Sequence, residues 1–146
     1  MVCVVLAFLQ QHPAIGVGPG AGAFARPQSM TLGKLLLDFF RYYGQEFRYA
    51  VTGISVLNGG CLFDRQQRGW TARTRNGQPT ICLESPVEPG TDIGTRVFKI
   101  GIIRAAFNHG YHILSSLFLS KEPIRGSLLC PFLLRRDHPL IVQRYR

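Results

Sequence analysis

The chain has 146 residues, enough for one domain. Hydrophobic residues make up 46% of it and charged residues 17%, a composition that excludes a disordered chain. Seventeen basic residues against eight acidic ones give a net charge of +9, which favours a polyanionic partner. Because no apolar run reaches the roughly 18 residues of a membrane span, we expect no integral membrane protein and no membrane partner.

The first 28 residues divide into two parts. Residues 1–15 are apolar up to residue 9 and break at Pro13, and we interpret them as the end of a core helix. A secretory signal peptide is the alternative, although no basic residue precedes the apolar run. Residues 16–28 are rich in glycine and proline and predict a linker, without the Lys-Ser/Thr that a phosphate-binding loop requires.

Two segments have the spacing of amphipathic helices. In 32–43, apolar residues recur at intervals of three and four, Ser29 or Thr31 can cap the start, and Gly44 can end the helix as its C′ residue. In 100–118, apolar residues again step by three and four over about five turns. The chain ends in a basic segment, 121–146.

Short strands are predicted between the two helices. Residues 51–56 are rich in β-branched side chains, Asn58-Gly59 is a hairpin turn signal, and 61–63 can form the return strand. Residues 81–83 alternate like a further strand, whereas the prolines and glycines of 86–94 exclude both a helix and a strand ladder. We therefore predict an α+β fold, mostly helical with a short β-hairpin or small sheet, for a domain spanning 29–120.

Motifs for metal-dependent or nucleophilic catalysis are missing. The closest group of acidic residues is Glu84, Glu88 and Asp92, without the Asp-x-Asp that a two-metal site usually contains. His109 and His112 have metal-ligand spacing but no third ligand nearby, and no serine lies in a nucleophile elbow. We expect no metal site and no catalytic residue in this chain.

The four cysteines are widely separated and form no C-x-x-C pair, which argues against a zinc finger. They are Cys3, Cys61, Cys82 and Cys130. Four reduced, buried or half-buried thiols are the favoured interpretation. Two disulfides in a small secreted protein are the alternative.

A polar segment, 65–78, combines arginines with a tryptophan and is interpreted as an exposed loop. Arginines can hold phosphates while an aromatic ring stacks on a base. The candidate RNA-binding residues are Arg65, Arg68, Trp70, Arg73 and Arg75. The alternative is a solvated loop with a single anchoring tryptophan.

Several motifs in order carry a resemblance to a known family. They are 8–13 (FLQQHP), 32–44 (LGKLLLDFFRYYG), 52–60 (TGISVLNGG) and 84–94 (ESPVEPGTDIG). Together they resemble the non-canonical poly(A) RNA polymerases of the TRAMP type, in the DNA polymerase β-like nucleotidyltransferase superfamily. The resemblance runs from about residue 1 to 118.

The resemblance implies the central, PAP-associated domain of such an enzyme. In whole enzymes this domain faces a catalytic palm whose aspartates bind two Mg²⁺ ions. The resemblance starts after the palm, so we expect this sequence to lack it and to be a truncated poly(A) RNA polymerase: the nucleotide- and RNA-binding half of an enzyme that adds adenylates to RNA 3′ ends, inactive alone. ATP as substrate, Mg²⁺, an RNA 3′ end, surveillance-complex proteins as partners and a nuclear location are implied with it.

The 84–94 segment is similar to the nucleotide recognition motif of the family. The resemblance assigns nucleotide binding to Glu88, Thr91, Asp92 and Gly94. A carboxylate there can accept a hydrogen bond from the N6 amine of adenine. Prolines hold the loop rigid, so that little entropy is lost on binding.

The chain departs from the family pattern at three points. Ser85 stands where the family usually has Asp, and Thr91 where poly(A) members have Asn and some uridylyl-transferring members have His. Residues 95–97 replace the usual Arg-Ser-Ser. The choice between ATP and UTP is therefore open. A non-enzymatic basic RNA-binding or interaction module is the alternative function.

Overall fold

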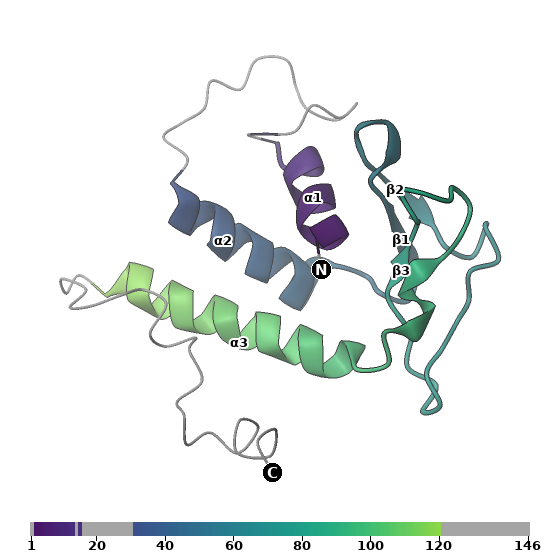
Figure 1. Cartoon of the computed structure of the whole chain (residues 1–146). Helices are drawn as coiled ribbons and strands as arrows, with labels where there is room; N and C mark the ends of the chain where they lie inside the picture. The colour runs from purple at the N-terminus through teal and green to yellow at the C-terminus, as the bar shows by residue number, and fades with distance from the viewer. Residues whose placement is uncertain (1, 14, 16–30, 121–146) are drawn as a thin grey trace, which may run out of the picture.

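The structure is a computed structural model that describes residues 2–13, 15 and 31–120 (Figure 1). The predicted linker 16–28 and the predicted basic segment 121–146 lie outside the described residues. The helices are α1 (Val2–Gln11), α2 (Leu32–Arg41) and α3 (Ile100–Leu119). The strands are β1 (Thr52–Ser55), β2 (Cys61–Asp64) and β3 (Cys82–Leu83).

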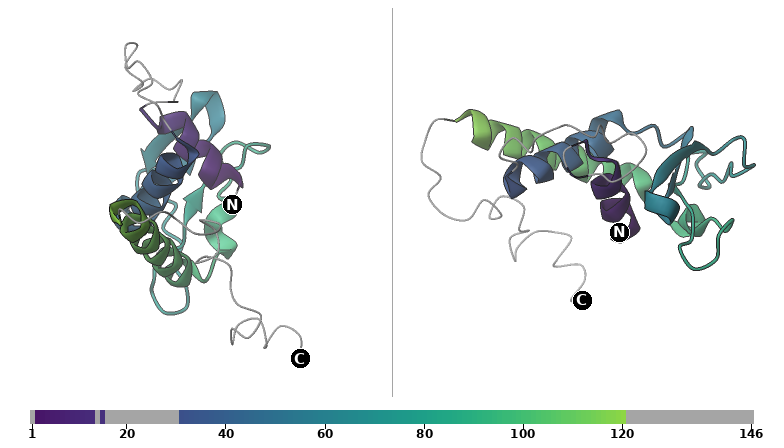
Figure 2. Two further views of the ribbon diagram at one scale, coloured as in Figure 1. Left: turned by 90° about the vertical axis from the view of Figure 1, so that its left-hand side faces the viewer. Right: turned by 90° about the horizontal axis from the view of Figure 1, so that it is seen from above.

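The helices lie together on one side and the small sheet on the other, as both views of Figure 2 also show. Helices α2 and α3 run side by side, and α1 packs between α2 and the sheet (Figure 1). This arrangement confirms the predicted α+β class with helices dominant. Among the described residues, no helix combines the length and the apolar character that crossing a bilayer would require.

Aromatic rings from all three helices form the centre of the core. Phe39 of α2 contacts Phe8 of α1 and Phe107 of α3 edge-on, at centroid distances of 5.3 and 5.4 Å. Tyr43 is almost completely buried, and its hydroxyl donates a hydrogen bond of 2.9 Å to the carbonyl of Val4. Helix α1 is therefore an integral part of the core.

Helix α2 starts at the predicted cap but does not end at the predicted residue. The Thr31 hydroxyl accepts a hydrogen bond of 3.2 Å from the backbone N–H of Lys34, as expected of an N-cap. The prediction that Gly44 ends the helix as its C′ residue is wrong, because the chain continues in a π-helical turn, Tyr42–Glu46. Gly44 is buried there, against the backbone of Asn108 in α3.

The sheet has the order β2-β1-β3. The predicted hairpin is confirmed: β1 and β2 pair antiparallel, and both Asn58 and Gly59 have positive φ. Strand β3 pairs with the other side of β1 in parallel, with Gly53 opposite Cys82. The central strand thus connects the hairpin to the segment that leads into the 84–94 loop.

The three described cysteines are free thiols. Cys82 is buried and Cys3 half-buried, as predicted, but Cys61 is exposed at the start of the outer strand β2, so the prediction of burial is wrong for this residue. Cys130 lies outside the described residues.

The contact at Gly44 gives a test of how tightly α2 and α3 approach. A Cβ at Gly44 would lie 2.8 Å from the backbone nitrogen of Asn108, so Gly44→Ala should lower the free energy of unfolding by about 1–3 kcal/mol. Gly101→Ala is the matched control in α3, since a Cβ there meets nothing within 4 Å; it should be neutral or stabilise by up to about 1 kcal/mol. Urea denaturation measures both, and equal effects would contradict the packing argument.

Candidate functional site

The 84–94 loop leaves the end of β3 and is anchored at its base by Glu84. The Glu84 side chain is buried, with 6% of the residue exposed. Its Oε1 accepts hydrogen bonds from Arg68 Nη1 at 2.9 Å and from the backbone N–H of Gly90 at 3.1 Å. One carboxylate oxygen therefore ties the far side of the loop to the sheet.

Ser85 organises the next turn of the loop. Its hydroxyl accepts hydrogen bonds from the backbone N–H groups of Val87 and Glu88, at 3.3 and 3.1 Å. Its own N–H donates to the carbonyl of Thr91 at 2.9 Å, which closes the loop across its base. Serine here makes local turn bonds of a kind that an aspartate side chain can also make.

Asp92 and Gly94 lie at the base of the loop. Asp92 Oδ1 accepts from the backbone N–H of Leu83 at 3.0 Å and of Gly94 at 2.8 Å, and it caps the 3₁₀ turn Ile93–Arg96. Gly94 is buried, and a Cβ there would collide with the carbonyl of Ile81. These contacts give both residues a part in shaping the loop.

Glu88 and Thr91 are placed differently, at the exposed tip. Residues 86–91 are all exposed, and Val87 leaves 85% of its surface in solvent. The predicted site residues thus separate into two pairs: Glu88 and Thr91 project outward, while Asp92 and Gly94 hold the base.

The electrostatics of the base favour a charged Glu84. A hydrogen bond from Ser55, and then those from Gly90 and Arg68 with the arginine charge, lower the pKa of Glu84 in spite of burial. Next to it, burial and the Asp92 carboxylate raise the pKa of the Cys82 thiol to about 12, so the thiol remains protonated and unreactive at neutral pH.

Arg65 corrects the prediction of an exposed, RNA-binding arginine. Only 2% of it is exposed. The guanidinium donates hydrogen bonds to four backbone carbonyls at 2.7–2.9 Å: those of Tyr49, Trp70, Ala72 and Thr80. With its donors used inside the protein, Arg65 is a structural residue that joins the start of β1 to the segment before β3.

Arg68 and Trp70 form a stacked group with Phe63. The Arg68 guanidinium lies 3.9 Å from the Phe63 ring centroid and makes the ion pair with Glu84. Trp70 meets Phe63 edge-on at 5.4 Å. Arg68 is therefore partly engaged in anchoring the loop, and Trp70 is half-buried rather than presented to a ligand.

The two remaining candidate arginines are exposed. Arg73 Nη1 donates to the carbonyl of Gly77 at 2.9 Å, which braces the turn at 74–78. Arg75 has no hydrogen bond or ion pair within the described residues. In that same part of the chain, no three His, Cys, Asp or Glu side chains gather in a way that could hold a metal ion.

The family resemblance is supported by direct comparison. Residues 31–91 match the family model described as Cid1 family poly A polymerase. The chain is 32% identical over 117 residues to Poly(A) RNA polymerase cid14 of Schizosaccharomyces pombe, and 34% identical over 119 residues to the Inactive non-canonical poly(A) RNA polymerase protein Trf4-2 of Drosophila melanogaster. Each alignment covers 80% of this chain, but 16% and 27% of the relative.

The fold agrees with this match. The solved polymerase core of TRAMP, described as an RNA surveillance complex, superposes with a TM-score of 0.68 over 89% of this chain and 40% of that chain, at 23% identity. The fold and the matched segment thus define a PAP-associated domain. Over this segment and in its fold the chain matches the PAP-associated domain of the Cid1 family poly(A) polymerases, and it spans between a sixth and about a quarter of the length of the two relatives named above.

The role of Arg65 can be tested by replacing its planar fork with an ammonium. Arg65→Lys keeps the charge but cannot reach carbonyls from three segments at once. Since each buried group left unpaired costs about 1–3 kcal/mol, we expect a loss of about 2–4 kcal/mol in the free energy of unfolding. Arg73→Lys, at an exposed arginine, is the control and should change it by no more than about 0.5 kcal/mol. A tolerated Arg65→Lys would contradict the structural role.

The anchoring of the loop should depend on pH with a defined sign. Because the pKa of Glu84 is lower in the folded state than its ordinary value of 4.5, ionised Glu84 stabilises the fold above that value, and this contribution is lost as pH falls through the folded pKa. The stability difference between the wild type and Glu84→Gln should therefore shrink between pH 5 and acidic pH. Chemical denaturation at each pH measures it, and a difference that stays constant would contradict the anchor.

Proposed function

We propose that this chain is the nucleotide-recognition part of a non-canonical poly(A) RNA polymerase, which adds adenylates to RNA 3′ ends. The observation that carries the proposal is the 84–94 loop, braced at its base by the buried Glu84 and the half-buried Asp92 and exposed at its tip. The match of residues 31–91 to the poly(A) polymerase family supports it.

The tip of the loop has the groups to read an adenine base. The Glu88 carboxylate can accept a hydrogen bond from the exocyclic N6 amine, and the Thr91 hydroxyl can donate or accept one at the ring. The hydrogen bond that the Ser85 hydroxyl accepts from the Glu88 N–H, and the one that Glu84 accepts from the Gly90 N–H, fix the backbone of this segment. A prearranged loop loses little conformational entropy when a nucleotide binds.

In this proposal Asp92 and Gly94 shape the loop and do not bind the nucleotide themselves. Asp92 Oδ1 is occupied by two backbone donors, and Gly94 fits under the carbonyl of Ile81. Both therefore set the direction in which the tip projects and make no direct contact with the base. At the base of the loop, Glu84 and Arg68 form an ion pair.

Of the steps in adenylate transfer, this chain is assigned nucleotide binding and no bond-making step. The described chain presents no cluster of side chains that fits Mg²⁺, so we assign it no metal and no step through a metal. Its part is to bind and orient ATP opposite an RNA 3′ end. Surveillance-complex proteins as partners and a nuclear location belong to the same proposal.

A second candidate function is a non-enzymatic RNA-binding module. One relative, the Drosophila protein, is named inactive, and the described part of this chain holds no metal-binding cluster. In that case the exposed arginines, with a net charge of +9, would hold RNA without nucleotide addition.

Titration of the full chain with ATP, followed by amide chemical shifts, tests the proposed function. We expect shifts at 87–91, saturating in the millimolar range typical of a weak site, and none there with inorganic triphosphate, which lacks a base. Thr91→Asn supplies both an amide donor and an acceptor. It should raise the affinity for ATP relative to UTP by about tenfold, equivalent to about one hydrogen bond. Glu88→Gln should weaken ATP binding.

The titration has a matched control on α2. Lys34→Gln changes an exposed side chain on α2, away from the loop, and should leave the ATP shifts unaltered. Shifts at 87–91 that triphosphate reproduces, or an absence of shifts there, would refute recognition of the base by this loop. Incorporation of labelled ATP into an oligo(A) primer by the purified chain would refute the assignment of a binding role alone.

A further inference from the structure

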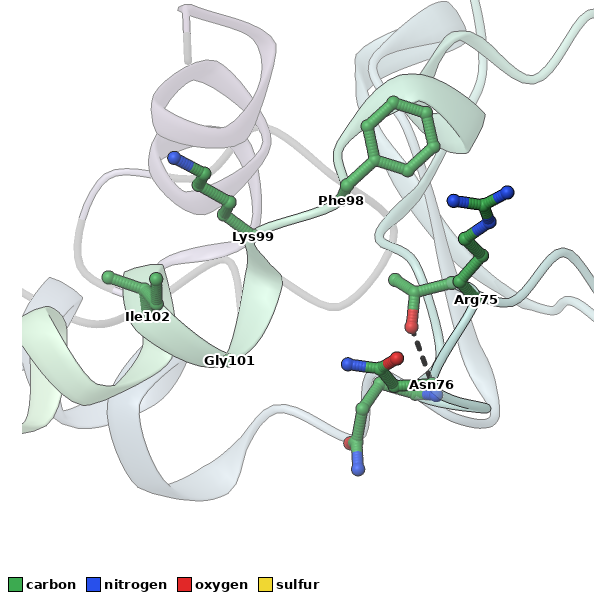
Figure 3. Close-up of a pocket in the computed structure, with 8 residues that line it drawn as sticks. Arg75, Asn76, Phe98, Lys99, Gly101 and Ile102 are labelled. Atoms are coloured by element: carbon green, nitrogen blue, oxygen red, sulfur yellow. Dashed lines mark hydrogen bonds between the residues drawn. The ribbon is translucent and has the colours of Figure 1, made fainter.

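A groove lies between the turn at 74–78 and the start of α3 (Figure 3). Its volume is about 680 Å³. Residues of the turn line one side and residues of the helix the other; they include Arg75, Asn76, Phe98, Lys99, Gly101 and Ile102. Figure 3 shows open space between the two sides, with Phe98 projecting above it in the direction that Arg75 also follows.

Both walls of the groove are rigid. In the turn, the N–H of Thr74 donates to the carbonyl of Gln78 at 2.8 Å, and that of Gly77 donates to the carbonyl of Thr74 at 2.9 Å. Arg65 fixes the base of this turn through the carbonyls of Ala72 and Thr80. The other wall is the first turn of a 20-residue helix, so a ligand would meet a preformed surface.

The groove is positively charged and its charges are unpaired. Arg75 and Lys99 line it, and neither makes an ion pair within the described residues, where the ion pairs involve other cations. None of the described residues that line the groove is acidic. Lys99 is also the N-cap of α3, and because no side chain caps this end, the helix adds partial positive charge. The charges favour an anionic ligand.

Exposed apolar side chains adjoin these cations. Phe98 is 68% exposed and Ile102 is 65% exposed. Trp70, the aromatic residue singled out from the sequence, is half-buried and packed edge-on against Phe63, whereas the Phe98 ring beside the groove is largely exposed. A free aromatic ring beside cations fits single-stranded nucleic acid, in which bases stack and phosphates pair, better than an acidic peptide, which would use the charges alone.

We infer that this groove binds single-stranded RNA, with Phe98 stacking on a base and Arg75 holding a phosphate. The inference rests on the proposed function, because it assigns a place to the RNA strand. The 3₁₀ turn Ile93–Arg96 joins the 84–94 loop to Phe98, so one short segment supports both the nucleotide loop and the groove.

Fluorescence anisotropy of labelled oligo(A) RNA with the full chain tests the groove. Arg75→Glu should weaken binding about tenfold and lower the slope of log affinity against log salt by about 0.7, the share of one phosphate contact on a single strand. Phe98→Ala should weaken binding about fivefold or more, the effect of losing one stacked base.

The matched controls are Lys34→Glu and Phe118→Ala. Lys34→Glu makes the same change in charge on α2, and Phe118→Ala removes a half-exposed ring at the far end of α3 (Figure 1). Both should retain affinity within about twofold. Groove variants that bind like the controls would overturn the inference, as would a loss with Arg75→Glu alone, because that result shows a phosphate contact without the base stacking assigned to Phe98.

The two proposals fail separately. If oligo(A) binds unchanged to the groove variants while ATP still shifts 87–91, the groove is wrong and the nucleotide loop stands. If ATP shifts nothing in the loop while the groove variants lose oligo(A), the nucleotide-recognition function is wrong and the chain is an RNA-binding module with its site in this groove.

Discussion

The buried guanidinium of Arg65 is the interaction on which the sheet and everything attached to it depend. Its donors reach the backbone before β1, the segment between β2 and β3, and Thr80, two residues before β3 begins. A buried charge is costly unless its hydrogen bonds are complete, and here four carbonyls complete them. This single side chain fixes where β3 lies, and therefore where the 84–94 loop and the turn at 74–78 begin.

In the 84–94 loop, one set of side chains holds the backbone and another set is exposed at the tip. The side chains of Glu84, Ser85 and Asp92 accept hydrogen bonds from backbone N–H groups, which fixes the backbone of the loop while the side chains at its tip stay open to solvent. The same division holds at the turn, where Arg73 braces the backbone and Arg75 stays uncommitted. Surfaces with defined geometry and spare hydrogen-bonding capacity are what specific recognition requires.

The sequence predicts the elements of this fold better than the roles of single residues. Apolar spacing is sufficient for α2 and α3, and Asn58-Gly59 for the hairpin, because both signals are local. Arg65 looks like a surface residue because its partners come from three segments that only folding brings together. Gly44 follows a helix like any terminating glycine, and its contact with Asn108 is visible only once α3 is in place. The prolines of the loop do indicate a rigid tip, but nothing local reveals that Asp92 turns inward.

The inward turn of Asp92 also determines how the sheet ends. Strand β3 is an outer strand, and the N–H of Glu84 bonds to the carbonyl of Ile54 while the N–H of Leu83 points the other way. The Asp92 carboxylate accepts the hydrogen bond from the Leu83 N–H, and the Ser85 N–H donates to the carbonyl of Thr91. The chain thereby covers its own free edge, so that no foreign strand can extend the sheet at this side and aggregation by edge pairing is blocked there.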